Sequence, residues 1–150
     1  MTQLQYRLRP ATEQDFDFVF QLKKQTEYDA IKRVFGWDES LQLRLHQQEW
    51  SQAKPTIVDI DNKPIGSYLL ERRSDHYYFG RFFILPEFQG MGLGSTIMRL
   101  CIGQAGPLPI NLAVLRGNRA VQLYSRYSFS IIEEDAHFVY MQRESVCSEE

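Results

Sequence analysis

Glycine occupies every second position from residue 90 to residue 94, between a strand pattern and a helix pattern. Residues 79–85 are dense in apolar and aromatic side chains, as in a buried strand. Pro86 then ends that strand, because proline has no N–H for a further ladder bond. After the glycines, apolar residues recur on one helical face: Ile97, Met98, Cys101 and Ile102. The segment therefore predicts a strand, a glycine turn and a helix in immediate succession.

Such a turn is suited to phosphate. Its N–H groups can point into one small concavity without interference from Cβ atoms, and the start of a helix adds partial positive charge. A dinucleotide-binding fingerprint is excluded, because Ser95 stands where the third glycine is needed and no carboxylate follows before Glu133. A P-loop is excluded as well, because no lysine follows Lys63.

Length and composition predict one globular domain spanning residues 1–150. Of its 150 residues, 43% are hydrophobic and 24% charged, which suits a single soluble core. The net charge of −2 provides no general attraction to nucleic acid or anionic lipid. No apolar run approaches about 20 residues, and no secretory signal is visible. Because Cys101 and Cys147 do not resemble a disulfide scaffold, we expect a reducing, cytoplasmic location.

The order of periodicities predicts an α+β, or mixed α/β, layer structure. A first helix is expected to be capped by Thr12 and Asp15, and a second by Asp38 or Ser40. The second helix carries three apolar residues, Leu41, Leu45 and Trp50. Strands are predicted at residues 5–9, 56–60, 65–71, 77–85, 110–115, 130–134 and 138–143, a later helix at 119–127, and a polar tail at 145–150.

The glycine turn resembles a known cofactor motif. Gln89-x-x-Gly92-x-Gly94, directly after a strand, is similar to the acyl-CoA signature of the GCN5-related N-acetyltransferase (GNAT) superfamily. The resemblance implies a central, mostly antiparallel sheet flanked by helices, with a splayed parallel strand pair at the acyl-CoA site. It also implies that the turn's amides hold the CoA pyrophosphate and that the end of the preceding strand pairs with pantetheine. Acetyl-CoA is therefore the expected cofactor.

A second motif occurs downstream. Asn118-x-x-Ala-x-x-Leu-Tyr124, followed by Phe129, resembles the GNAT segment in which the Asn lies near the CoA arm and the Tyr protonates the departing thiolate. The family usually has glycine before this Phe, whereas this chain has Ser128, and a left-handed turn there costs about 1 kcal/mol without glycine. The expected cofactor-binding residues are Ile84, Leu85, Gln89, Gly90, Met91, Gly92, Leu93, Gly94, Ser95, Asn118 and Tyr124.

The reaction needs three kinds of groups. A phenol, Tyr124, can serve as the acid, and a backbone N–H at Ile84 or Leu85 can stabilise the developing oxyanion. A base must remove the proton of the attacking amine. Glu71 and His137 are the side-chain candidates for this base, and a water relay to backbone carbonyls is the alternative.

The resemblance implies that the two-helix segment and the last hairpin select the acceptor. Acidic and aromatic groups there suit a cationic amine. The expected substrate-binding residues are Glu27, Tyr28, Trp37, Tyr78 and Arg81. Trp37 could instead fill the core, and Arg72 and Arg73 are expected to be solvated.

Two functions remain. The first is an acyl-CoA-dependent N-acyltransferase that transfers an acetyl group to a small-molecule or protein amine by direct attack in a ternary complex. The second is a non-catalytic acyl-CoA binding or sensing module. No metal, nucleic acid or membrane partner is expected, and the resemblance allows a homodimer.

Overall fold

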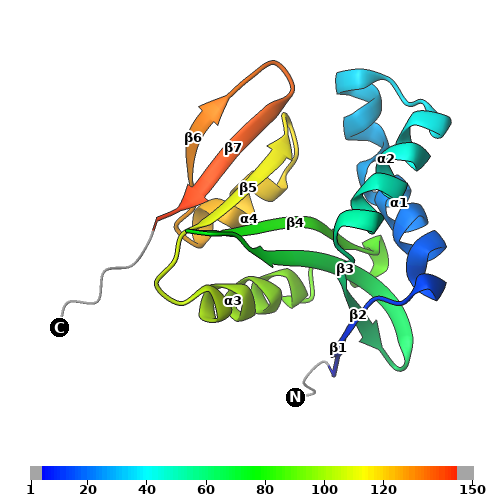
Figure 1. Ribbon diagram of the computed structural model, residues 1–150, viewed down its shortest axis with the longest axis horizontal. Helices are drawn as coiled ribbons and strands as arrows, with labels where there is room; N and C mark the ends of the chain where they lie inside the picture. The colour runs from blue at the N-terminus through cyan, green and yellow to red at the C-terminus, as the bar shows by residue number, and fades with distance from the viewer. Residues whose placement is uncertain (1–4, 145–150) are drawn as a thin grey trace. The chain divides into compact units, whose positions relative to one another are not determined.

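Seven strands form one hydrogen-bonded sheet in the order β1-β2-β3-β4-β5-β7-β6 in the computed structural model (Figure 1). The structure describes residues 5–144, so the predicted polar tail at 145–150, with Cys147, lies outside the described residues. Two compact units divide the chain. The N-terminal unit is Met1–Leu69 with Arg81–Phe88, and the C-terminal unit is Leu70–Gly80 with Gln89–Glu150. Strands β3 (Lys63–Arg72) and β4 (Tyr77–Ile84) contribute residues to both.

The sheet is mixed, as predicted. In β4 and β5 (Ile110–Leu115), Tyr77 pairs with Ile110 and Tyr78 with Asn111 in parallel. This register covers only two residues although β5 continues to Leu115, which agrees with the splayed parallel pair that the resemblance implies. The pairs β1–β2, β2–β3, β5–β7 and β6–β7 are antiparallel.

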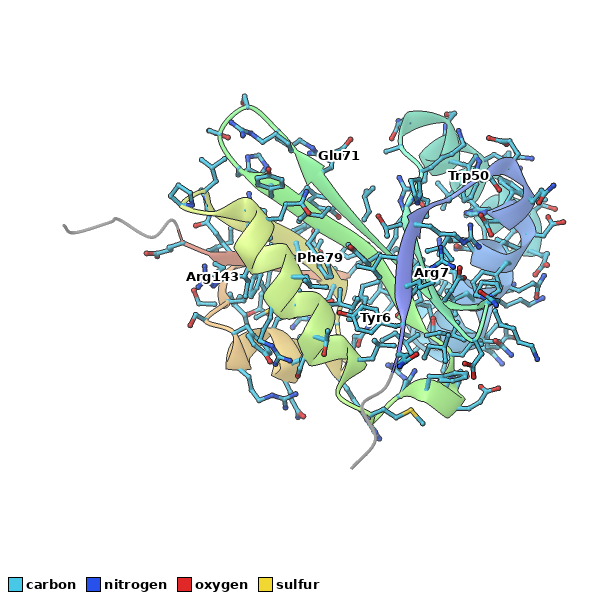
Figure 2. All side chains as sticks on the ribbon, turned by 90° about the horizontal axis from the view of Figure 1, so that it is seen from below. Tyr6, Arg7, Trp50, Glu71, Phe79 and Arg143 are labelled. Carbon is cyan, nitrogen blue, oxygen red and sulfur yellow. The ribbon has the colours of Figure 1, made fainter. Side chains whose placement is uncertain are left out.

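The N-terminal unit places a helix pair on its strands. Strand β1 (Arg7–Pro10) and the 3₁₀ turn η1 (Glu13–Asp15) lead into α1 (Phe16–Phe35), and α2 (Glu39–Gln52) precedes β2 (Thr56–Ile60). Ala11, Val19, Trp50 and Ile57 form a buried cluster where these elements meet. Trp50 of this cluster is labelled in Figure 2.

Local signals set the ends of these elements, and the cap at Asp38 is one that was predicted. Gly36 follows α1 with φ 79°, and Asp38 caps α2 by accepting a hydrogen bond from the Leu41 N–H at 3.1 Å. Asp61 and Asn62 both have positive φ and form the two-residue turn between β2 and β3. Each of these signals acts within a few residues of the chain.

Polar residues form much of the buried face of α2. Gln42, His46 and Trp50 are buried, whereas Leu41 and Leu45 are more than one-third exposed. Imidazole and indole rings can fill an interior when their polar atoms are satisfied, and the His46 Nε2 hydrogen-bonds the Phe16 carbonyl at 2.9 Å. The interior between α1 and α2 is therefore partly polar.

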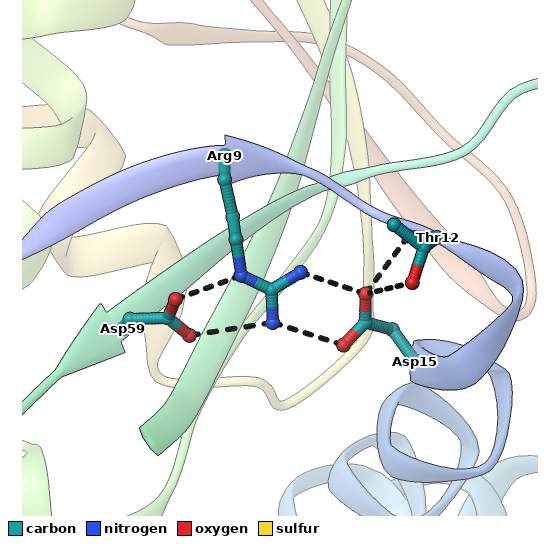
Figure 3. Close-up of polar contacts among 4 residues, drawn as sticks. All are labelled: Arg9, Thr12, Asp15 and Asp59. Carbon is teal, nitrogen blue, oxygen red and sulfur yellow. Dashed lines mark hydrogen bonds and ion pairs between the residues drawn. The ribbon is translucent and has the colours of Figure 1, made fainter. Parts of the chain in front are cut away.

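An arginine joins β1, β2 and the start of α1 (Figure 3). Arg9 donates to Asp59 at 2.7 Å and to both oxygens of Asp15 at 2.8 and 3.0 Å. Asp15 also accepts from the Thr12 N–H at 2.8 Å, which is the capping contact predicted from the sequence. The Arg9 guanidinium lowers the pKa of the Asp15 carboxyl, and the two carboxylates raise the pKa of Arg9.

The C-terminal unit buries mostly apolar residues. It contains α3 (Leu93–Ala105), β5, α4 (Ala120–Arg126), β6 (Ser130–Glu134) and β7 (Phe138–Arg143). The inner face of α3 holds Ile97, Met98 and Cys101, as predicted, whereas Ile102, predicted on the same face, is half-buried. Burial raises the pKa of the Cys101 thiol to about 12. Within residues 5–144 no helix is long and apolar enough to cross a bilayer.

Candidate active site

The glycine turn has the predicted conformation. Gly90 and Gly92 have φ of 79° and 81°, a region that residues with a Cβ rarely adopt. Apart from the two chain neighbours of each glycine, no described atom lies within 4 Å of the place where a Cβ would stand, so the turn is open rather than packed. The glycines are therefore required by the backbone path and not by close contacts.

Helix α3 begins directly at this turn. The Thr96 N–H donates to the Gly92 carbonyl at 3.0 Å, so the amides of Leu93, Gly94 and Ser95 belong to the first turn, which has no intrahelical acceptors. Gly92 also has no side chain that could cap them. Donors of this kind at a positive helix end are suited to an anion. Met91 is 53% exposed, as expected for a loop side chain.

Two side chains of α3 bond to one hydroxyl outside the helix. The Ser95 side chain and the Arg99 guanidinium both hydrogen-bond the Tyr127 hydroxyl, the latter at 3.2 Å, and together they lower the pKa of Tyr127. The sequence analysis missed Arg99 and Tyr127. Arg99 could have been found from its position, because it lies one helical turn after Ser95 on the same face. Tyr127 had no such signal. Arg99 adds a positive charge to α3, one turn beyond the glycine turn.

The downstream motif is built around α4. The Asn118 side-chain oxygen accepts from the Ala120 N–H at 2.8 Å, so this oxygen holds the start of α4. Tyr124 is only 4% exposed, and its ring meets Phe79 edge-on at 6.1 Å and lies 5.8 Å from Phe129. Ser128 adopts a φ of 72°, so the left-handed turn forms without glycine. These contacts fix the orientation of the Tyr124 ring.

The end of β4 changes one prediction. Ile84 is buried, and the Leu85 N–H donates to the Ile65 carbonyl at 2.9 Å. Because that donor already bonds β3, Leu85 is not supported as an oxyanion donor.

The two base candidates have different surroundings. Glu71 pairs with Arg73 at 2.9 Å, and the Arg73 guanidinium lies 4.8 Å from the centre of the Tyr78 ring. The structure therefore brings together Glu71 and the predicted substrate residue Tyr78 through an arginine. Glu71 is labelled in Figure 2 and lies one residue before the end of β3.

His137 lies in the turn directly before β7, which begins at Phe138. The backbone N–H of His137 donates to the Asp135 carboxylate at 2.8 Å, and the residue is exposed. The same carboxylate accepts from the Tyr140 hydroxyl at 2.7 Å. His137 is therefore held by its backbone on the β6–β7 hairpin.

The predicted acceptor residues of the helix pair also form contacts. The rings of Tyr28 and Trp37 lie 5.1 Å apart, and the Trp37 indole N–H donates to Glu39 at 2.9 Å. Trp37 is only half-buried, so it does not fill the core. Glu27, one residue before Tyr28 on α1, is half-buried as well.

Arg81 is the predicted acceptor residue that the structure places in a different role. Its guanidinium donates to the Ala53 carbonyl at 2.6 Å and to the Glu49 carbonyl at 3.0 Å, both at the end of α2. A guanidinium committed to two backbone carbonyls is a structural contact. Among residues 5–144, no three His, Cys, Asp or Glu side chains are grouped as metal ligands would be.

Comparison with known proteins agrees with this arrangement. A family model described as Acetyltransferase (GNAT) family matches residues 17–129. The structure of the ribosomal-protein-S18-alanine N-acetyltransferase from Escherichia coli aligns with a TM-score of 0.72 at 13% identity, covering 97% of both chains.

Two ligand-bound structures are also similar. Spermidine N-acetyltransferase from Vibrio cholerae, in complex with CoA and spermine, aligns with a TM-score of 0.65 at 21% identity, over 92% of this chain and 94% of that one. N-acetyltransferase PseH from Campylobacter jejuni, in complex with acetyl coenzyme A, aligns with a TM-score of 0.59 at 20% identity, over 93% and 99%. No curated protein matches the sequence. Because the family model covers most of its length, this chain belongs to the acetyltransferase (GNAT) family.

Proposed function

We propose that this protein is an acetyl-CoA-dependent N-acetyltransferase that transfers the acetyl group to a primary amine by direct attack in a ternary complex. The observation that carries the proposal is the open turn with left-handed Gly90 and Gly92 at the start of α3. Family membership supports acetyl transfer in general, and the CoA and acetyl-CoA complexes of similar structures support the cofactor.

The residues of the turn fit a diphosphate. The amides of Leu93, Gly94 and Ser95 would donate to its oxygens, and the absence of a side chain at Gly92 lets an anion approach the backbone. Gln89, Gly90 and Met91 would complete the turn. When bound, acetyl-CoA supplies a thioester carbonyl that an amine can attack.

The remaining residues would handle protons and charge. The hydroxyl of Tyr124 would donate a proton to the leaving sulfur, and the Ile84 N–H would donate to the carbonyl oxygen as negative charge develops. Glu71, His137 or a water relay would take the proton from the amine. The contacts of Tyr124 with Phe79 and Phe129 support an acid in one fixed orientation.

The acceptor class is an amine on a small molecule or on a protein. The names of similar structures include both kinds, namely spermidine and an alanine of a ribosomal protein. In this chain the aromatic pair Tyr28 and Trp37, together with Glu27, would bind the acceptor. The alternative function, a non-catalytic acyl-CoA binding module, keeps the glycine turn and lacks turnover.

One experiment separates these functions. The protein is mixed with acetyl-CoA, and thiol release is followed over polyamines, amino acids, aminoglycosides and peptide N-termini. Thiol release that depends on both the protein and one amine class is the expected result. Tight binding of acetyl-CoA without release from any of these amines would favour the binding module and contradict the proposed enzyme.

A further inference from the structure

Arg81 has an unusual backbone conformation for an arginine within a strand. Its φ is +49°, in the left-handed region, although it lies inside β4. Residues other than glycine rarely hold this conformation, and they persist in it where surrounding contacts stabilise it. The contacts of Arg81 should therefore reveal what stabilises it.

The side chain of Arg81 hydrogen-bonds carbonyls at the C-terminal end of α2. The Nη1 donates to the Ala53 carbonyl at 2.6 Å and the Nη2 to the Glu49 carbonyl at 3.0 Å, while the Nε lies 4.0 Å from the Glu49 carboxylate. The Ala53 N–H donates to the same Glu49 carbonyl. A helix end exposes carbonyls that lack intrahelical donors, and a cation there also meets the negative end of the helix dipole. The Arg81 side chain is only 14% exposed, so it is a built part of the interior.

The backbone of Arg81 is held from the other side by β3. The Ser67 hydroxyl donates to the Arg81 carbonyl at 3.1 Å, and Ser67 is fully buried. A Cβ at Gly66 would lie 2.8 Å from the Phe83 carbonyl oxygen, so the two strands approach closely just beyond Arg81. The left-handed residue is thus fitted to a Gly-Ser pair on β3 and to the end of α2 at once. All these residues belong to the N-terminal unit.

We propose that Arg81 is a positioning residue that fixes the C-terminal end of α2 to the last residues of β4, 82–85. This inference rests on the proposed function, in which the helix pair binds the acceptor and Ile84 supplies the oxyanion donor. Without the guanidinium, the Ala53 and Glu49 carbonyls at the end of α2 lose the hydrogen bonds from Arg81. The direction of residues 82–85 is then no longer fixed relative to the helix pair. The acceptor step should suffer more than the binding of acetyl-CoA, whose expected phosphate contacts lie in residues 89–95.

The test compares Arg81→Gly with the matched control Arg44→Ala. Glycine adopts a φ of +49° without strain, so Arg81→Gly removes the guanidinium and leaves the backbone conformation accessible. Arg44→Ala removes an exposed guanidinium from α2 itself. For Arg81→Gly we expect KM for the best amine acceptor to rise about tenfold or more, with a smaller change in kcat and acetyl-CoA affinity within about twofold. Arg44→Ala should match the wild type.

Two further measurements keep the inference falsifiable. Free guanidinium at low millimolar concentration should restore part of the lost activity of Arg81→Gly, whereas sodium chloride should not. Hydrogen exchange in the wild type and in Arg81→Gly should show faster exchange of residues 49–53 in the variant, with residues 93–105 unchanged. The exchange measurement needs no substrate, so it tests the contact even if no amine is acetylated.

Unchanged KM together with unchanged exchange would overturn the inference. Equal losses of acetyl-CoA affinity and acceptor affinity, without guanidinium rescue, would also overturn it, because they would mark a general structural defect. If Arg81→Gly is insoluble, Arg81→Lys takes its place: it keeps one cation at the end of α2 but not two donors, and we expect its KM for the amine acceptor to exceed that of the wild type. A wild-type KM for Arg81→Lys would contradict the need for two donors.

Discussion

The interior of the N-terminal unit is partly polar, whereas the interior of the C-terminal unit is almost entirely apolar. Among the described residues, the buried polar or charged side chains are Asp15, Gln42, His46 and Ser67, and all four belong to the N-terminal unit. In the C-terminal unit the polar groups of the proposed site lie mostly in turns and at a helix start. The difference shows that individual side-chain hydrogen bonds and ion pairs help to stabilise the N-terminal unit, whereas glycine conformations shape the proposed cofactor turn of the C-terminal unit.

The largest expected effect on stability comes from Asp15→Ala. This change leaves Arg9 with one carboxylate and removes the acceptor for the Thr12 N–H, so the free energy of unfolding should fall by about 3 kcal/mol. Chemical denaturation measures it. The exposed neighbour Asp17→Ala should change the value by about 0.5 kcal/mol or less. Equal effects of the two variants would remove the contrast between the units.

Tyr124→Phe tests the C-terminal unit by its chemistry. The ring and its contacts with Phe79 and Phe129 remain, and only the hydroxyl is lost. We expect kcat to fall about 100-fold, in the range for a general acid, with acetyl-CoA affinity nearly unchanged. Steady-state kinetics and calorimetry on the same preparation measure both. A Phe variant with wild-type kcat would exclude Tyr124 from the mechanism.

The units also differ in how sequence signals foretell them. The glycine turn, the Asp38 cap and most of the buried face of α3 were predicted, because each signal acts within a few residues. The contacts that were missed join distant residues. Arg9 is 50 positions from Asp59, His46 is 30 from Phe16, and Arg81 is 28 from Ala53.

Apolar character alone does not mark the buried face of α2. Leu41 and Leu45 are apolar but more than one-third exposed, whereas Gln42 and His46 are buried. Residue spacing cannot show that the Phe16 carbonyl of α1 hydrogen-bonds the His46 imidazole. The structural role of Arg81 has no sequence signal either, because its partners are backbone carbonyls. The sequence analysis therefore interpreted Arg81 as a substrate residue.

A pH titration sharpens the comparison further. Burial lowers the pKa of His46 in the folded state, so the unfolded chain binds a proton at higher pH than the folded one. The His46 contribution is therefore fully present above pH about 6.5, the ordinary His value, and is lost as the pH falls from there toward the lower folded pKa. Denaturation curves should show this loss in the wild type and a smaller one in His46→Phe. An identical slope in both proteins would contradict the account.

The smallest expected effect is a gain. Ser128 holds a φ of 72° after α4, and Ser128→Gly should relieve that strain. Glycine also has more freedom in the unfolded chain, so the net increase in the free energy of unfolding should be about 0.5 kcal/mol. Thermal unfolding at fixed pH measures this difference. A loss of stability would mean that the Ser128 side chain makes a needed contact.

The most direct test of the central claim is an acetyl-CoA titration by calorimetry with three proteins: the wild type, Gly92→Asp and Gly103→Asp. Gly92→Asp places a negative charge at the start of α3 and a side chain where φ is 81°, whereas Gly103→Asp puts the same charge at an exposed position late in the same helix. We predict binding by the wild type and by Gly103→Asp, and no detectable binding by Gly92→Asp. Unchanged affinity in Gly92→Asp, or no binding by the wild type, would contradict the assignment of the glycine turn as the acyl-CoA site.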